Sequence, residues 1–283
     1  MKNQLERSIV IMMNEQEERL QEVYSPKRIA AGAKEGDSLA YQEARARANM
    51  YHFFSDIFLN PPQRGFLDQI AKKDFLDELS SLFGEKGVAE LKEFAATVHL
   101  DEDLEALKKE YMDLFAVPTG RYVTPFEDVY RGMVVDGKQE RGPLLGKKAI
   151  AVIRMYREAG AEMNEACMEL PTHIGVELSF MRFLCEREAQ AIHNEERDIL
   201  IDGERKTEAW DSIRHRDLQI RFLQEHLNEW FPQLSQSIQA NTKGPFYRGL
   251  ALMTESFIVQ DTAKLLGQLN SERRVPCGSH KLQ

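Results

Sequence analysis

Apolar side chains recur at helical spacing over most of the chain, and the first long stripe begins after Ser38. The stripe consists of Tyr41, Ala44, Ala48, Tyr51, Phe54 and Phe58. Phe53 and Ile57 widen it until the helix is apolar on most sides, which is typical of a buried helix. The sequence Asn60-Pro61-Pro62 ends this helix, because a residue before proline disfavours the helical conformation.

Further helical stripes follow, separated by Gly and Pro. They predict helices at residues 66–70, 75–83, 88–95, 101–115, 143–160, 172–185, 210–230 and from 246 onward. Asp101 and Thr172 are the predicted N-caps of their helices. Alternating patterns typical of strands are limited to residues 122–124 and 133–135. The pattern therefore predicts an all-α fold, a single globular helical bundle with short connections and no fixed-period repeat.

Residues 116–142 form the longest interruption of the helical pattern. Long loops inside compact domains are uncommon and are often functional. This one contains the aromatic and acidic run Thr124-Pro125-Phe126-Glu127-Asp128-Val129-Tyr130. We expect the loop to contribute to a binding site, and it is also long enough to serve as the hinge of a domain-swapped dimer. The sequence leaves open whether the protein is a monomer or such a dimer.

Three segments are distinguished by composition. Residues 1–36 are predicted to be an N-terminal helical arm and linker, with a thin apolar stripe that begins at Leu5. Residues 37–270 are predicted to form the helical domain, and residues 271–283 a disordered tail. The arm either packs against another surface or remains a solvated appendage.

The charge balance narrows the function classes. The chain of 283 residues contains 46 Asp+Glu against 37 Lys+Arg, for a net charge of −9. This balance disfavours nucleic acid as a partner and favours basic peptides. No apolar run reaches the roughly 20 residues of a membrane helix, so we expect no stable membrane insertion. No secretory signal pattern is found at the N-terminus, so we expect a cytoplasmic protein.

Catalytic and metal-binding patterns are weak. The three cysteines form no Cys-x-x-Cys pair, and Cys185 lies on an apolar stripe where a thiol is inert. His173 and Glu177 stand one helical turn apart and form the basis of an alternative, a helical-bundle metalloenzyme with His226 as a further ligand. Two neighbouring ligands do not make a metal site and His226 is far along the chain, so we expect no cofactor and no enzyme activity.

The carboxylates of the long loop are adjacent. Because neighbours in an extended segment point to opposite sides, Glu127 and Asp128 are poor candidates for paired acid–base catalysis. Together with Glu110 and Asp113 of the preceding helix, they would form an acidic rim around aromatic side chains. The alternative is that the aromatic residues belong to the core and the acids are solvated.

Three motifs, in order along the chain, resemble the TorD/DmsD/NarJ family of molybdoenzyme maturation chaperones. The segment from Glu110-Tyr111 to Leu114-Phe115 resembles the family's E-Y-x-x-L-F motif. The loop from Pro125 to Tyr130 is similar to P-P-[WY]-E-S-V-Y, and residues 169–181 are similar to E-x-P-D-H-I-x-x-E-L-x-F-M. The chain departs from these motifs at Thr172 in place of Asp, at Phe126 in place of Trp or Tyr, and at Asp128 in place of Ser.

The resemblance implies a TorD-like all-α fold and a chaperone, not an enzyme. Such a chaperone binds the N-terminal segment, often a twin-arginine signal peptide, of the apo-form of a molybdenum oxidoreductase catalytic subunit. It holds the subunit for cofactor insertion and delays export. The peptide-binding residues that it implies here are Glu110, Tyr111, Pro125, Phe126, Glu127, Asp128, Tyr130, Thr172, His173 and Glu177. We expect apolar burial to supply most of the affinity and the acids to steer association, so that Glu127→Lys lowers the on-rate. A structural adaptor that acts through the N-terminal arm is the third hypothesis.

Overall fold

The computed structural model describes residues 38–118, 120–135, 138–163, 168–202 and 209–274. The predicted N-terminal arm, Cys167, Cys277 and most of the predicted tail lie outside these residues. Within them the fold is all-α, as predicted, apart from one antiparallel hairpin of two short strands, β1 (Met133–Val135) and β2 (Lys138–Glu140). The helix that was predicted to end near residue 270 continues to Arg274.

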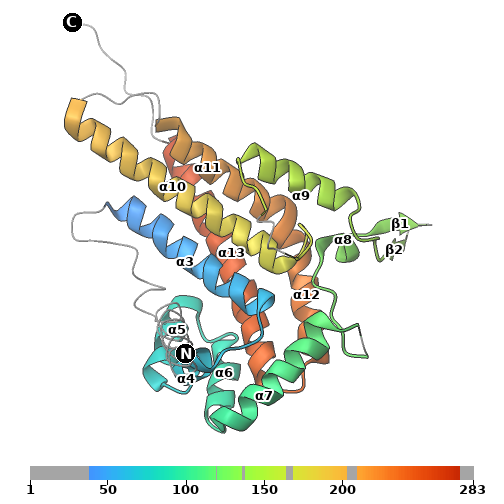
Figure 1. Ribbon diagram of the computed structural model, residues 1–283. Helices are drawn as coiled ribbons and strands as arrows, with labels where there is room; N and C mark the ends of the chain where they lie inside the picture. The colour runs from blue at the N-terminus through green and yellow to red at the C-terminus, as the bar shows by residue number, and fades with distance from the viewer. Residues whose placement is uncertain (1–37, 119, 136–137, 164–167, 203–208, 275–283) are drawn as a thin grey trace, which may run out of the picture.

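Four long helices build the centre of the bundle, as Figure 1 shows: α3 (Leu39–Leu59), α10 (Ile174–Asp202), α11 (Ala209–Phe222) and α13 (Pro245–Arg274). Helix α10 packs along α3 on one side and along α11 on the other. As predicted, α3 begins where the Ser38 hydroxyl accepts a hydrogen bond from the Tyr41 N–H at 3.2 Å, and it ends at Asn60.

Shorter helices cover one end of this bundle: α4 (Arg64–Ile70), α5 (Lys73–Phe83), α6 (Val88–Ala95) and α7 (Leu100–Tyr111). Helix α7 continues into a π-helical turn, η1 (Met112–Ala116). Asp101 is not the N-cap of α7, as the sequence pattern predicted. That position belongs to His99, whose N–H donates to the Asp103 carboxylate at 2.6 Å.

The remaining helices lie beside the predicted long loop: α8 (Glu127–Tyr130), α9 (Lys147–Glu158) and α12 (Asn228–Asn241). Helix α11 leads into α12 through a second π-helical turn, η2 (Leu223–Leu227). The prediction that Phe231-Pro232 ends a helix is wrong, because α12 continues through Pro232. The hydrogen bond that this proline removes lies just after η2, where the regular ladder is already interrupted.

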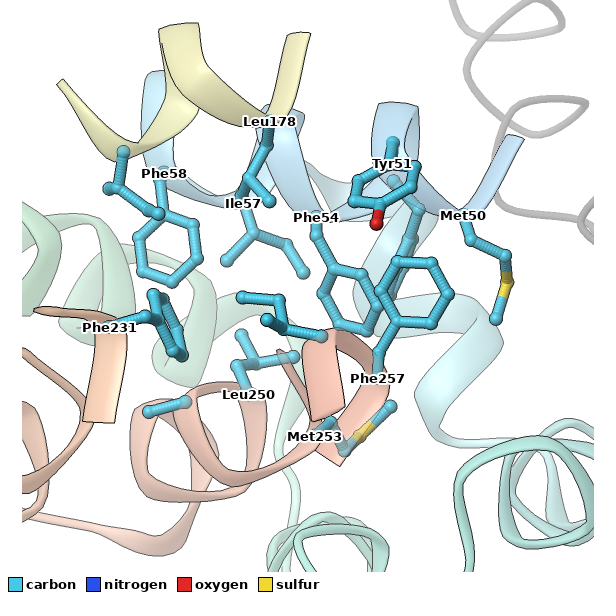
Figure 2. Packing of buried hydrophobic residues seen from close by; sticks show 14 of the residues in the cluster. Met50, Tyr51, Phe54, Ile57, Phe58, Leu178, Phe231, Leu250, Met253 and Phe257 are labelled. Atoms are coloured by element: carbon cyan, nitrogen blue, oxygen red, sulfur yellow. The ribbon is translucent and has the colours of Figure 1, made fainter. Parts of the chain in front are cut away.

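The core is a continuous aromatic and aliphatic cluster between α3, α10, α12 and α13. Figure 2 shows Phe54 stacked on Phe257, with ring centroids 5.3 Å apart, and Phe58 edge-on to Phe231 at 6.0 Å. Leu178 of α10 reaches the same cluster and is 0% exposed. The widened stripe of α3 therefore faces several helices at once, as its pattern predicted.

A buried polar group also joins these helices. The Arg47 guanidinium on α3 donates to Asp261 of α13 at 2.6 Å, to Glu188 of α10 at 3.2 Å and to Gln219 of α11. Tyr51 donates to the same Asp261 at 2.6 Å. Because each of these groups has buried partners, removing one would leave an uncompensated charge in the core.

Gly175 sets the approach of α10 to the end of α3. A Cβ atom at this position would lie 2.5 Å from Cγ of Leu59 and 3.2 Å from the Ser55 carbonyl oxygen. The Ser55 hydroxyl donates to the Gly175 carbonyl oxygen at 2.8 Å, so the two backbones are close there. The absent side chain therefore fixes where the first turn of α10 lies. No helix in the described part of the chain has both the length and the apolar character that a bilayer span requires.

Candidate functional site

The loop before α8 pairs with the residues that lead into α10. The Glu127 N–H donates to the Thr172 carbonyl oxygen at 3.0 Å, and the Ile174 N–H donates to the Pro125 carbonyl oxygen at 2.9 Å. These bonds frame an antiparallel bridge between Phe126 and His173, whose rings meet edge to face at 5.3 Å. The second and third sequence motifs therefore form one structural unit.

Glu127 is fully buried and is held from two directions. Its carboxylate lies 2.8 Å from Nδ1 of His226 in η2 and 2.7 Å from the Arg131 guanidinium. Burial alone would raise the pKa of Glu127, but the hydrogen bonds and charges of His226 and Arg131 outweigh it and lower the pKa. An ionised carboxylate only accepts hydrogen bonds, so the proton lies on Nδ1 of His226. The Arg131 guanidinium also donates to the Glu225 backbone carbonyl.

Glu177 lies beside this group in the opposite protonation state. Its Oε2 accepts a hydrogen bond from the Trp230 indole N–H at 3.0 Å, whereas Oε1 has no hydrogen-bond partner among the described residues. Complete burial raises the pKa of Glu177 well above its usual value, and the nearby Glu127 carboxylate raises it further. The protonated form of Glu177 is therefore favoured, next to an ionised carboxylate.

Asp128 joins the starts of two helices. Its Oδ1 accepts a hydrogen bond from the Ala149 N–H in the first turn of α9, at 3.1 Å. Its Oδ2 accepts one from the Thr172 hydroxyl, also at 3.1 Å. The prediction that Thr172 caps α10 is therefore wrong, because its hydroxyl is used on Asp128. Glu127 faces η2 and Asp128 faces α9, but the two acids lie in the helix α8 and not in an extended segment as the sequence pattern had indicated.

His173 performs the capping role in place of Thr172. Its Nδ1 accepts a hydrogen bond from the Gly175 N–H at 3.1 Å, and its carbonyl oxygen accepts those of Val176 and Glu177. The imidazole is only 3% exposed, and burial lowers its pKa to about 4. It is therefore neutral at neutral pH. A side chain that caps a helix in this way is not free to bind a metal through Nδ1.

Glu110 and Tyr111, at the end of α7, lie apart from the unit around Phe126 and His173. The Glu110 carboxylate accepts hydrogen bonds from the Lys243 N–H at 2.6 Å and the Thr242 hydroxyl at 3.0 Å, where α12 turns into α13. The Tyr111 hydroxyl donates to the Phe58 carbonyl oxygen at 2.9 Å, so this residue lies in the core. The structure therefore separates these two predicted residues from the unit around Phe126 and His173.

The prediction that these acids form a rim around the aromatic side chains is wrong. Glu127 and Glu177 are 0% exposed and Asp128 is 3% exposed, so none of these carboxylates is available to a peptide at the surface. Burial is tolerated because each acid is either hydrogen-bonded or neutral. Phe126 and Tyr130 are only half-buried, and Tyr130 lies over Trp230 with ring centroids 5.6 Å apart. The exposed parts of the unit are thus aromatic and not acidic.

Sequence reasoning missed three residues of this unit, namely Arg131, His226 and Trp230. Arg131 stands one helical turn after Glu127, a spacing that favours an ion pair, and could have been found from that signal. His226 was considered only as a further ligand in the metalloenzyme alternative. Trp230 was predicted only as part of the helix at residues 210–230, and its fully buried indole donates the hydrogen bond to Glu177. Within the described residues, no group of three or more His, Cys, Asp or Glu could hold a metal ion.

An open apolar pocket of about 220 Å³ lies along the first turns of α10, directly after His173. Val176, Phe180 and Phe183 of α10 form one wall. Tyr156 of α9 faces them, with its ring centroid 4.4 Å from that of Phe180. Its hydroxyl donates to the Pro171 carbonyl oxygen at 2.8 Å, which connects the pocket to the approach to His173. Leu59 at the end of α3 completes the lining of the pocket.

Several proteins of known function resemble part of this chain. A perchlorate reductase assembly chaperone protein of Dechloromonas aromatica is 28% identical over 170 residues, which cover 60% of this chain and 65% of that protein. A chaperone protein TorD of Photobacterium profundum is 27% identical over 168 residues, 59% of this chain and 67% of that one. A selenate reductase assembly chaperone protein of Thauera selenatis is 27% identical over 150 residues, 52% of this chain and 65% of that one. The chain thus covers about two thirds of the length of these relatives.

The family assignment rests on a match to a family model. Residues 83–236, more than half of the chain, match the nitrate reductase delta subunit family. This span includes α8, the start of α10, η2 and Trp230, that is, every element of the unit described above. The relatives are named as chaperones and not as enzymes. The resemblance inferred from the three motifs is confirmed, and the chain belongs to the nitrate reductase delta subunit family, together with TorD-type assembly chaperones.

Proposed function

We propose that this protein is a maturation chaperone for a molybdenum oxidoreductase. It acts in the cytoplasm and binds the N-terminal segment of the apo catalytic subunit, or its twin-arginine signal peptide where one is present. Binding holds the subunit until its cofactor has been inserted and delays export until then. The names of the relatives, which are assembly chaperones of perchlorate and selenate reductases, support the general role.

The observation that supports peptide binding most directly is the position of the apolar pocket. The pocket begins immediately after the Phe126–His173 bridge, on the helix that follows His173 and contains Glu177. A rigid frame beside an open apolar surface suits recognition of an apolar segment, because little ordering of the receptor is then required.

The same frame argues for a binding function over a catalytic one. The carboxyl groups and imidazoles of the unit are buried, and they are used to join α8 to α9, α10 and η2. No structural observation favours the metalloenzyme alternative. The adaptor hypothesis depends on residues 1–36, which lie outside the described residues.

Calorimetry with a synthetic peptide tests the proposal. The probe contains two adjacent arginines followed by an apolar stretch of about ten residues, and the matched control replaces both arginines with glutamine. We expect the probe to bind with a dissociation constant in the micromolar range or tighter, roughly −8 kcal/mol, and the control to bind more weakly. In parallel, the tagged full-length chain is purified from its host and its partners are identified by mass spectrometry. If the probe does not bind and no molybdoenzyme catalytic subunit is recovered, the proposal is wrong.

A further inference from the structure

We propose that the pocket between α9 and α10 is an anchor site for one large apolar side chain, Phe or Leu, that stands next to a basic residue in the client segment. This inference rests on the proposed function and adds to it the residues that select the client. It follows from the size of the pocket, the nature of its walls and the distribution of charge around it.

The size of the pocket indicates a single side chain. It encloses about 220 Å³, and a cavity of roughly 150 Å³ already holds a benzene ring. A complete apolar stretch of a peptide would not fit into this volume. The expected arrangement is therefore one inserted side chain, with the neighbouring residues of the peptide lying across the rim.

The walls favour an aromatic or a large aliphatic group. Phe180 is packed from behind by Phe222 at 4.9 Å and from the side by Tyr156, so its ring is held in place. Met163, which is 37% exposed, lies at the rim and is a flexible side chain that adapts to the inserted group. Rigid aromatic walls combined with an adaptable rim are suited to accept one residue class in different clients.

The surrounding charge is asymmetric, and this asymmetry selects a basic neighbour. From residue 158 to residue 181 the chain contains no lysine or arginine. Glu177 is buried and Glu158 pairs with Arg221 at 2.9 Å, so the asymmetry rests on the exposed Glu162 and Glu169. Glu162 is exposed and lines the pocket, and the Glu169 side chain is 44% exposed beside His173. On the opposite side, the Arg187 guanidinium lies 5.0 Å from the centre of the Phe183 ring. A peptide whose anchor occupies the pocket would therefore place its basic residues toward Glu162 and Glu169.

Glu162 and Glu169 would steer the association of a basic peptide. The sequence pattern had assigned this role to Glu127 and Asp128, which are buried. Glu162 and Glu169 precede α10 and remain in contact with solvent, so they are free to meet an arginine. Exposed pairs of this kind contribute little to affinity but steer association and set orientation.

A double-mutant cycle between protein and peptide tests the anchor. Ala161, which lines the pocket, is replaced by Phe to fill it, and exposed Ala89 of α6 is replaced by Phe as the matched control. The probe is the arginine-containing peptide with one Phe next to the arginines, compared with its Phe→Ala version by fluorescence anisotropy. We expect the Phe→Ala change to weaken binding to the natural chain by about tenfold or more. Ala161→Phe should weaken the Phe peptide by a similar factor and leave the Ala peptide unchanged, whereas Ala89→Phe should have no effect.

A second pair of variants tests the basic neighbour. Glu162→Gln should lower the association rate and reduce its dependence on salt, whereas Glu105→Gln on α7 should change neither.

If the natural chain binds the Phe and Ala peptides equally well, or if Ala161→Phe binds the Phe peptide normally, the anchor site is wrong and the proposed function stands. If the natural chain binds neither peptide, the proposed function fails as well. If Ala161→Phe converts a dimer into a monomer in solution, the pocket contacts a second copy of the chain, and the assignment to a client is wrong.

Discussion

The Glu127 carboxylate lies 2.8 Å from Nδ1 of His226, although the two residues are separated by 99 positions in the chain. This contact joins the loop before α8 to the π-helical turn between α11 and α12, and Arg131 supports it from one helical turn away. Together with the contacts of Asp128 and Tyr130, it holds α8 against the bundle even though the helix spans only Glu127–Tyr130.

We predict that Glu127→Lys destabilises the fold, instead of only slowing peptide association as the sequence pattern had indicated. The substitution would place a buried cation beside Arg131 and His226. The expected loss is about 3–5 kcal/mol in the free energy of unfolding, measured by urea denaturation. Glu229, whose side chain is 55% exposed, is the control, because its pair with Arg131 at 3.6 Å is at the surface. Glu229→Lys should cost about 1 kcal/mol or less. Equal losses in the two variants would contradict the buried role of Glu127.

Glu177→Gln should be tolerated, and its benefit should grow with pH. Glu177 keeps its proton in the folded state, whereas the unfolded chain releases that proton above a pKa of 4.5. The folded state therefore binds more protons, and the natural chain loses stability as the pH rises above this value. Glutamine has no proton to release and still offers an oxygen to the Trp230 indole. Urea denaturation between about pH 5 and about pH 8 should show the Gln variant gaining relative to the natural chain. A constant difference across this range would mean that Glu177 is ionised when folded.

His173→Asn should remove part of the loss of stability in acid. The pKa of His173 falls from 6.5 to about 4 on folding, so the unfolded chain binds a proton that the folded chain refuses. Stability is therefore lost as the pH falls from 6.5 toward 4, by up to roughly 3 kcal/mol. Asparagine is a good N-cap and does not titrate in this range. Thermal unfolding should show a flatter pH profile for His173→Asn, and exposed His99→Asn should keep the natural profile. Parallel profiles for His173→Asn and the natural chain would refute the assignment.

Leu114→Ala should cost about 2–5 kcal/mol in the free energy of unfolding. Leu114 is 0% exposed in η1, so the substitution leaves a cavity in the core. Met112 belongs to the same turn and is 44% exposed, which makes Met112→Ala a matched control. The control should cost less than about 1 kcal/mol. Chemical denaturation of the two variants checks the difference, and similar losses would show that the burial of Leu114 contributes little.

Local signals were sufficient for much of the fold. Ser38 and Asn60-Pro61-Pro62 mark the two ends of α3 because capping and proline effects act within a few residues. The strand pattern at residues 133–135 coincides with β1. The same approach failed where distant residues decide the outcome. Pro232 remains inside a helix because the preceding π-helical turn already interrupts the regular hydrogen bonds.

The sequence predicted which residues form the candidate site better than it predicted their burial. The motifs brought together Phe126, Glu127, Asp128, Thr172 and His173, which the structure unites. Their burial was not evident, because His226 and Trp230, the groups that compensate Glu127 and Glu177, are distant in the sequence. The pocket was missed for a related reason. Val176 and Phe180 were assigned to a central helix, and only the approach of α9 shows that part of this face remains open.

Asp128 contacts the first turn of α9 and the residue before His173, and these two helices supply the facing walls of the anchor pocket. The spacing between the walls is therefore governed by a side chain that does not line the pocket. If the pocket accepts a client side chain as proposed, substitutions at position 128 would change which client fits, with the aromatic lining left intact.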